Sequence, residues 1–545
     1  MKENLSIDLK EEVDRLESLI LDYNSFDMIA ALSFKELACN PETYRECDHE
    51  GIGAIVEYVS LLYLKQPFNE GKYPINSQIL VSVGETAKKI FSEVNLYNII
   101  KAQDEAMGKP IDKLEELKYF YVNNELFIRN PSYQHLLRKA IIDIFQPLNR
   151  WFLENLGFTI EEALIINDAM ESLINAKLSD HRIETIQKEK DLIKQLRKYR
   201  STKKLVDEKN YEILNDLAKY PWDEAIKKLR IYVGENSLAS FGYIYTFTVE
   251  DISTKCDIPI ERVQLYLNLF SIEFGSVNSE MFMLSPTHEL KSSPFISHKG
   301  KYICPNPQLL LWSLQSTLEK ALNPDSSGSV NKNRHLWDKY IDLRSSYVEQ
   351  ESIKILLNTL KYAVGYNNIT YNSTEGKNRQ YELDGLIIFD DNLFLIECKA
   401  GNFTSSARRG SKERLLKDVN SLIIDAHNQA LRAKNYIDST DLPKFVSKDK
   451  CDVIIDKSAI KRTFLINVTL DQLDAFTTGL NKTAKLGLFK NKELPWAVSF
   501  FDLIVICEMI EFPSQLIHYL VRRLKLNELD NITAHDELDW FGNYI

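Results

Sequence analysis

The feature that most constrains this chain is a pair of apolar, strand-like runs separated by a tight polar turn. The first run is Tyr381–Phe389 and the second is Leu393–Cys398, with Asp390, Asp391 and Asn392 at the junction. Apolar runs of this length around an Asp/Asn cluster are typical of a β-hairpin. The sequence therefore predicts two paired strands whose ends carry polar residues.

Charged residues lie at the open end of this predicted hairpin. Side chains alternate between the two faces of a strand, so Glu397 and Lys399 share one face and Cys398 points to the other. Pairing the strands brings Asp384 beside Glu397. Two neighbouring carboxylates suit a hard divalent cation such as Mg²⁺, and a lysine beside them adds positive charge. Phosphodiester hydrolysis needs an activated water and stabilisation of negative charge, and a bound cation with a neighbouring lysine can supply both.

Asp384, followed after twelve residues by Glu397-x-Lys399, resembles the motif of the PD-(D/E)XK nuclease superfamily. The resemblance covers residues 335 to 510, and it departs from the pattern at Leu383, where the family has proline. It implies a restriction-endonuclease-like core in which Asp384, Glu397 and the Cys398 backbone carbonyl bind Mg²⁺ or Mn²⁺. It also implies that Lys399 positions or activates the attacking water.

Two further residues are candidates by the same resemblance. Family members often place a metal-supporting glutamate on the helix before the hairpin, and Glu349 shares the apolar face of that predicted helix. Glu351 lies on its flank and is the second choice. Family members also carry a polar residue, frequently glutamine, on the helix after the lysine strand. Gln429 matches that position, whereas His427 is interpreted as a helix-surface histidine.

Basic residues gather around the predicted site. Residues 399–434 contain eight Lys and Arg against three Asp and Glu, whereas the whole chain has a net charge of −11. A local basic patch in an acidic protein favours contact with a phosphate backbone. The residues we expect to contact nucleic acid are Arg408, Arg409, Lys412 and Arg432. A solvated loop and helix is the alternative interpretation of the same charges.

The fold class follows from the order of predicted helices and strands along the whole chain. We expect a multidomain protein with a mainly α-helical N-terminal region and a C-terminal α/β restriction-endonuclease-like domain with a mixed central sheet. The C-terminal domain, 335–545, should contain helices at Leu336–Leu360 and Lys412–Ile437 and a strand at Thr463–Val468. It should end with a short strand and two packed helices.

The N-terminal region, residues 1–230, is expected to act as a sensor or to bind a protein partner or a second copy of the chain. It shows recurrent 3.6-residue periodicity and little glycine. The basic stretch Lys188–Lys204 has Leu192, Ile193 and Leu196 on one side. It is either the solvated face of a long helix or a helix that contacts nucleic acid.

Residues 231–322 resemble a winged-helix unit. Apolar Val249 and Ile252 precede a polar turn, Pro259 suits the first turn of a second helix, and Lys299-Gly300 suits a hairpin turn. Such units read DNA or serve only for packing and docking, and the sequence does not decide between these roles. The segment 323–334, NPDSSGSVNKNR, is rich in turn formers and is predicted to be a linker.

Composition limits the remaining classes. Seven scattered cysteines without a CxxC pair argue against a disulfide framework or a zinc ribbon. The N-terminus lacks the apolar core of a signal peptide, and no stretch reaches the ~18 apolar residues of a membrane span. We therefore expect a cytoplasmic protein without a membrane partner. No GxxxxGK[ST] loop is present, which argues against ATP or GTP hydrolysis.

These observations predict a metal-dependent endonuclease that hydrolyses phosphodiester bonds. DNA is the favoured substrate by resemblance, and the architecture resembles bacterial defence or restriction effectors with an antiviral role. The alternative is a catalytically silent, nuclease-like module that binds nucleic acid or assembles with a regulating partner.

Overall fold

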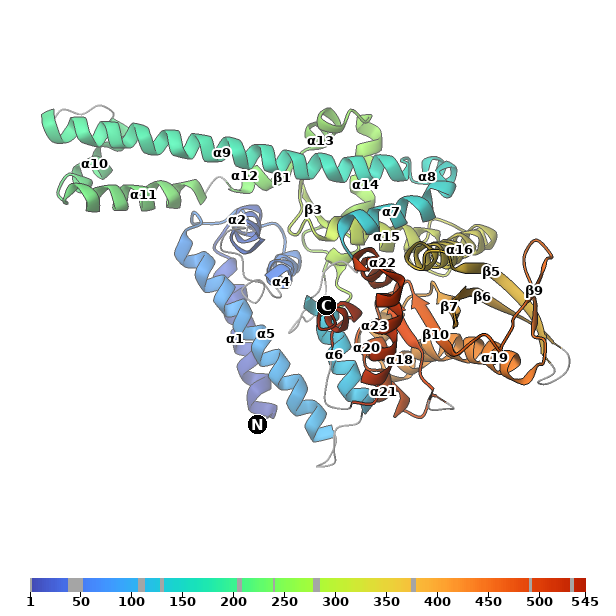
Figure 1. Ribbon diagram of the computed structural model, residues 1–545. Coiled ribbons are helices and arrows are strands. Elements are labelled where there is room, and N and C mark those ends of the chain that lie inside the picture. Colours follow the sequence, from blue (N-terminus) through green and yellow to red (C-terminus); the bar gives the residue numbers. More distant parts are fainter. Residues whose placement is uncertain are drawn as a thin grey trace. The chain divides into compact units, whose positions relative to one another are not determined.

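The structure is a computed structural model in which residues 2–37, 52–105, 113–127, 132–202, 208–238, 241–277, 285–373, 379–489, 493–529 and 534–545 are described. The chain divides into two compact units. The first comprises Met1–Lys101, Asn149–Leu284 and His288–Leu318, and the second comprises Ala102–Leu148, Ser285–Thr287 and Glu319–Ile545. Most described residues are helical, and the larger of the two described sheets lies in the second unit (Figure 1).

The first unit is largely α-helical, as expected for the N-terminal region. Its helices up to residue 245 are α1 (Lys2–Ile20), α2 (Ser25–Leu37), α4 (Ile52–Leu64), most of α5 (Ser77–Glu105), α8 (Asn149–Asn155), α9 (Ile160–Thr202), α10 (Tyr211–Leu217), α11 (Trp222–Leu238) and α12 (Phe241–Tyr245). No helix within the described residues is both long and apolar enough to cross a membrane.

The basic stretch Lys188–Lys204 falls at the end of α9, apart from Lys203 and Lys204, which lie outside the described residues. Leu192, Leu196 and Tyr199 are buried against apolar residues of α10 and α11. The apolar side of this stretch is therefore used for packing, and the basic side chains occupy the rest of the helix surface.

The middle segment contains the helices and the hairpin that the sequence predicts. Helix α13 (Val249–Cys256) begins with a capping box between Thr248 and Asp251, and Pro259 is the N-cap of α14 (Ile260–Phe270). Strands β3 (Phe295–His298) and β4 (Lys301–Ile303) pair around the turn at 299–300. With β1 (Thr246–Phe247) and β2 (Ser271–Glu273) they form a four-stranded sheet.

The second unit is built on a mixed seven-stranded sheet in the order β11-β10-β7-β6-β5-β8-β9. Each pair of adjacent strands from β9 through β8, β5 and β6 to β7 is antiparallel, whereas β10 is parallel to both β7 and β11. The bounds are β5 Val364–Ser373, β6 Arg379–Phe389, β7 Asn392–Lys399, β8 Lys444–Val446, β9 Asp452–Ile454, β10 Arg462–Thr469 and β11 Trp496–Ser499. The mixed central sheet predicted from the sequence is thus present.

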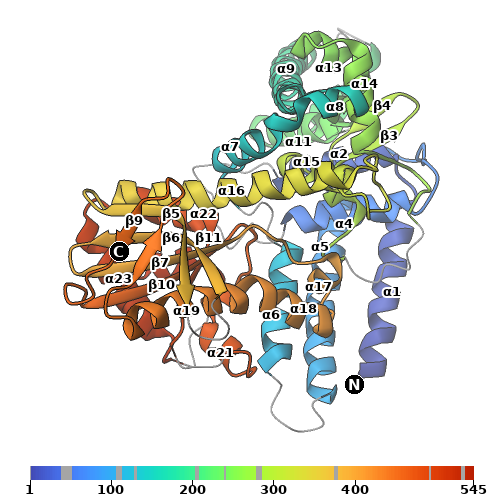
Figure 2. The ribbon, with the colours of Figure 1, turned by 90° about the vertical axis from the view of Figure 1, so that its right-hand side faces the viewer.

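Helices cover both faces of this sheet. Helix α16 (Arg334–Thr359) and helix α19 (Asp425–Ser439) lie on opposite sides of the strands in Figure 2. The predicted helix Lys412–Ile437 is present as α18 (Lys412–Val419), a π-helical turn (Asn420–Ile424) and α19. The buried Asn467 of β10 donates to the Ile423 carbonyl at 3.1 Å, which satisfies a backbone acceptor in the π turn.

The C-terminal segment adds α20 (Ala475–Thr478), α21 (Leu480–Ala484), α22 (Phe500–Met509), α23 (Pro513–Leu526) and α24 (Glu537–Gly542). This matches the expected strand followed by two packed helices, with α24 in addition. The expected linker up to Asn333 contains no helix or strand, and Asn333 caps α16.

The second unit also contains α6 (Lys113–Phe127) and α7 (Gln134–Phe145), although the sequence prediction placed 102–148 in the N-terminal region. Leu114, Leu117 and Tyr121 of α6 are buried in the same core as Phe403 and Phe476. Helix α6 is therefore an integral part of the unit that contains the large sheet.

Candidate active site

The predicted hairpin is formed by β6 and β7. The two strands pair from Gly385 opposite Ile396 to Phe389 opposite Asn392, and Asp390 takes a left-handed φ of 50° in the turn. Asp and Asn tolerate this conformation better than most residues, which explains their place in the turn.

The backbone pairing between β6 and β7 ends just before the two residues that carry the predicted carboxylates. By register Asp384 lies opposite Glu397, one step beyond the last paired residues. There Asp384 Oδ2 accepts a hydrogen bond of 2.7 Å from the Cys398 backbone N–H. The side chain thus takes the place of a backbone acceptor, and this bond holds the Asp384 carboxylate at the end of β7.

Glycine at position 385 lets the hairpin approach helix α16 closely. A Cβ atom there would lie 2.6 Å from Ile353 Cδ1. The residue after Asp384 must therefore be very small, because α16 passes directly over this point of β6.

The two carboxylates are poorly solvated. Glu397 is 1% exposed, and its Oε1 atom has no hydrogen-bond partner among the described residues. Burial raises the pKa of Glu397 well above its usual range, and the neighbouring Asp384 raises it further. Burial also raises the pKa of Asp384 to about 6; the bond from Cys398 opposes this rise, and the charge of Glu349 adds to it. Burial is the main cause of both shifts, and a nearby carboxylate adds to each: Glu349 for Asp384, and Asp384 for Glu397.

The Lys399 ammonium is held in position by a hydrogen bond to helix α19. Its Nζ donates to Gln429 Oε1 of α19 at 2.6 Å and lies 3.7 Å from Glu397 Oε2. The structure therefore brings together Asp384, Glu397, Lys399 and Gln429, all four of which were singled out from the sequence.

The first-choice glutamate of α16 is also near this group. Glu349 Oε2 accepts a 3.0 Å bond from Asn368 Nδ2 of β5, and its charge acts on Asp384. Glu351 instead pairs with Lys354 at 2.8 Å and Lys139 at 3.4 Å. Between the two candidates, Glu349 is therefore the one connected to the motif.

Cys398 faces away from the carboxylates, as alternation predicts. Its thiol is buried beside Ser352 of α16, and burial raises the pKa of the thiol well above its usual range. Cys256, Cys304, Cys451 and Cys507 are likewise free of disulfides; Cys39 and Cys47 lie outside the described residues.

The four predicted phosphate contacts have different surroundings. Arg432 lies over the Tyr381 ring, 4.4 Å from its centroid, and its charge acts on Glu397. The exposed Arg409 donates to Thr287 Oγ1 at 3.1 Å, and Lys412 pairs with Glu115 at 2.6 Å.

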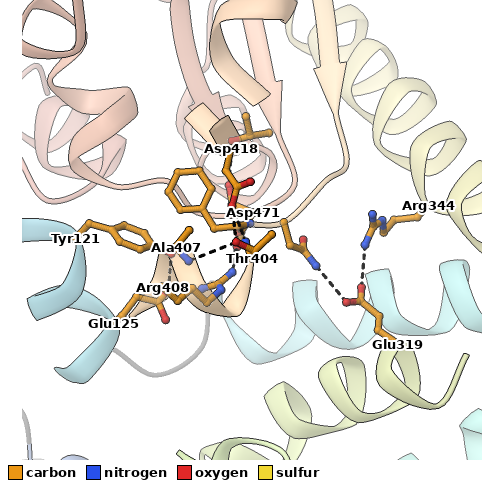
Figure 3. Close-up of polar contacts among 12 residues, drawn as sticks. Tyr121, Glu125, Glu319, Arg344, Thr404, Ala407, Arg408, Asp418 and Asp471 are labelled. Carbon is orange, nitrogen blue, oxygen red and sulfur yellow. Dashed lines mark hydrogen bonds and ion pairs between the residues drawn. The ribbon is translucent and has the colours of Figure 1, made fainter. Parts of the chain in front are cut away.

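Arg408 does not fit the predicted role. Its guanidinium lies between Glu125 of α6 and Asp471, with bonds of 2.7 and 2.6 Å to the two Asp471 oxygens (Figure 3). The side chain is 17% exposed and already neutralised by two carboxylates. This engagement with two carboxylates favours a structural role for Arg408 over the predicted phosphate contact.

The sequence interpretation of His427 as a surface histidine is wrong. His427 is fully buried, 5.2 Å from the Phe489 ring between centroids. The sequence also missed Asn368 as a neighbour of the site. The only signal was an Asn-Asn pair within an otherwise β-type run.

The donor set fits a hard divalent cation. Asp384 and Glu397 supply carboxylate oxygens, and the orphaned Glu397 Oε1 is an acceptor that a cation would satisfy. Within the described residues, no group of three or more His, Cys, Asp or Glu side chains is arranged to hold a metal ion. A cation here would therefore need oxygens other than these side chains, such as the predicted Cys398 carbonyl, or a closer approach of Glu349.

Comparison with known protein families, with curated proteins and with solved structures gives no match to this chain.

Proposed function

We propose that this chain is a metal-dependent nuclease whose C-terminal unit has a restriction-endonuclease-like core. The observation that supports it most is the group at the open end of the β6–β7 hairpin. There a buried carboxylate pair, with one orphaned oxygen, lies beside a lysine held by a glutamine. A fold does not by itself call for such an electrostatically costly arrangement, which is typical of functional sites.

In this proposal each residue has a distinct task. Asp384 and Glu397 would hold Mg²⁺ or Mn²⁺, together with the Cys398 carbonyl and Glu349. When bound, the cation supplies Lewis-acid stabilisation of the phosphoryl oxygens and lowers the pKa of the attacking water. Lys399 orients that water and takes up developing negative charge. Gln429 fixes the ammonium in place, so that little reorganisation is needed during the reaction.

DNA is the proposed substrate, and it would contact the site through its phosphates. Arg409, Lys412 and Arg432 are the proposed phosphate contacts, because Arg408 is engaged within the protein. The charge of Arg432 acts on Glu397, so among the three it is the one proposed to contact the scissile phosphate. A role in bacterial defence against foreign DNA is the biological setting that we propose.

The test is cleavage of supercoiled plasmid and of linear DNA in Mg²⁺ or Mn²⁺ by the full chain. Asp384→Ala and Lys399→Ala should both abolish cleavage. Matched controls are Asp449→Ala and Lys448→Ala, which change exposed residues in the loop between β8 and β9. Comparing the two substrates shows whether free ends are required.

The outcomes separate the nuclease from its alternative. Cleavage that is lost in both site variants but kept in both controls supports the proposal. If the wild type cleaves neither DNA nor RNA but binds Mn²⁺ in a manner that requires Asp384, a silent module awaiting a partner is favoured. Absence of both cleavage and Mn²⁺ binding would overturn the proposal.

A further inference from the structure

Asn368 has an unusual backbone conformation in the middle of strand β5. The strand pairs Asn367 with Gly385 and Ile369 with Leu383 on β6, so the register places Asn368 opposite Asp384. Its φ is 47°, in the left-handed region that non-glycine residues rarely adopt. Such outliers persist only where the surroundings enforce them, and they cluster at functional sites.

The Asn368 carboxamide has one hydrogen bond within the described part of the protein. Nδ2 donates to Glu349 Oε2 at 3.0 Å, while the buried Oδ1 atom has no partner there. The carboxamide therefore does not complete a structural network of the strand. Its one hydrogen bond among the described residues is to the glutamate whose charge acts on Asp384.

We propose that Asn368 is a positioning residue that holds the Glu349 carboxylate towards Asp384 for divalent-cation binding. The inference rests on the proposed function, and it adds to that site a residue from a third strand, β5. Without the amide donor, Glu349 would be free to turn away from Asp384, because like charges repel. Asparagine suits the task, since it tolerates the left-handed backbone and carries a donor.

Residues that orient metal ligands contribute measurably to affinity, typically ~10–100-fold. We therefore expect Asn368→Gly to weaken Mn²⁺ binding about tenfold. Glycine keeps the left-handed backbone accessible and removes the side chain, including its carboxamide. The matched control is Asn367→Gly, which changes the exposed neighbouring residue.

The experiment is a titration of the full chain with Mn²⁺, followed by electron paramagnetic resonance of the free ion and without DNA. Asn368→Ala is titrated as well, because alanine disfavours the left-handed backbone that glycine accepts. Weaker binding by both variants, with wild-type binding by Asn367→Gly, supports the proposal. Wild-type affinity in either folded Asn368 variant overturns it.

A double-mutant cycle shows whether Asn368 acts through Glu349. In a Glu349→Ala background, Asn368→Gly should change Mn²⁺ affinity less than twofold, because the carboxylate that it positions is gone. An unchanged tenfold effect in that background overturns the positioning role. If wild-type binding does not require Asp384, the proposed function itself has failed; if binding requires Asp384 but is insensitive to Asn368, only this inference has failed.

Discussion

The Lys399 ammonium donates a 2.6 Å hydrogen bond to the Gln429 side-chain oxygen, and this bond joins strand β7 to helix α19 across one face of the sheet. The same Nζ atom lies 3.7 Å from Glu397 Oε2. The lysine is therefore shared between a glutamine that fixes its direction and a carboxylate that it partly neutralises. Substitution can therefore measure separately the contribution of the lysine charge and the contribution of its orientation by Gln429.

Removing the Lys399 ammonium should lower the cleavage rate more than removing the Gln429 side chain that orients it. We expect Lys399→Ala to lower the rate of DNA cleavage at least ~100-fold, because charge stabilisation at the reacting phosphate is lost. Gln429→Ala should lower it about tenfold, since the ammonium remains but is less well placed. Single-turnover cleavage at saturating Mg²⁺ measures both effects. Equal losses would mean that Gln429 itself contacts the substrate.

The carboxylate pair should lower the stability of the metal-free protein. Because burial and Asp384 raise the pKa of Glu397, its ionised form is unfavourable in the fold. We expect Glu397→Gln to raise the free energy of unfolding by about 1–3 kcal/mol at pH 8 without metal, although cleavage is abolished. Urea unfolding measures the change, with Asp449→Asn as the exposed control. A lower stability for Glu397→Gln would contradict this view of the site.

Substitution of Arg408 is predicted to lower the stability of the protein and to leave its affinity for DNA unchanged. Truncation to alanine removes the guanidinium that neutralises the buried carboxylates of Glu125 and Asp471, which should cost about 3–5 kcal/mol of unfolding free energy. Arg409→Ala, at the exposed neighbouring position, should stay within about 0.5 kcal/mol of the wild type. Denaturant unfolding compares the two. A stable Arg408→Ala protein with weakened DNA affinity would restore the original prediction for Arg408.

Most of the second unit's layout could be predicted because its strands are strongly patterned. The apolar runs of β6, β7 and β10 and the long helices α16 and α19 lie where periodicity places them. Strand β5 was missed because Val364–Ser373 contains a glycine and three asparagines, which are depleted in strands. Helix α6 could not be assigned to this unit, since its packing against Phe403 and Phe476 depends on contacts distant in sequence.

The site was predictable where it depends on local geometry and not where it depends on tertiary contacts. Strand alternation places Glu397 and Lys399 together, and helix periodicity favours Glu349 over Glu351. Local charge density, in contrast, could not show that Arg408 has carboxylates on two other segments as partners. The proposed role of Asn368 rests on its left-handed backbone and its hydrogen bond to Glu349, neither of which has a reliable signature in the sequence.

Gly385 is predicted to be required for the packing of α16 on the hairpin. A Cβ atom at this position would lie 2.6 Å from Ile353 Cδ1 and 2.8 Å from Ile353 Cγ1. We expect Gly385→Ala to destabilise the protein by about 1–3 kcal/mol, as overpacking does. Ile353→Ala should relieve the clash, so the double variant should be more stable than the sum of the single changes predicts. Additive effects in thermal unfolding would show that the clash is relieved elsewhere.

A buried carboxyl outside the candidate site should make stability depend on pH. Asp502 lies in the first turn of α22, where burial and the nearby Asp536 raise its pKa to about 8. Since this is above the usual Asp value of 3.8, the folded state binds the proton more tightly than the unfolded chain does. Its contribution to stability is thus fully present below about pH 4 and is lost as the pH rises towards 8.

Asp502→Asn cannot ionise, so the variant should gain stability over the wild type as the pH rises from 5 to 8. The difference should grow by up to about 1.4 kcal/mol per pH unit, because the other titrating groups are common to both proteins. Urea unfolding at several pH values measures it, with the exposed Asp441→Asn as the control that should show no trend. A difference that does not change with pH would mean that Asp502 is ionised throughout, and hence that a cationic partner or water stabilises its charge.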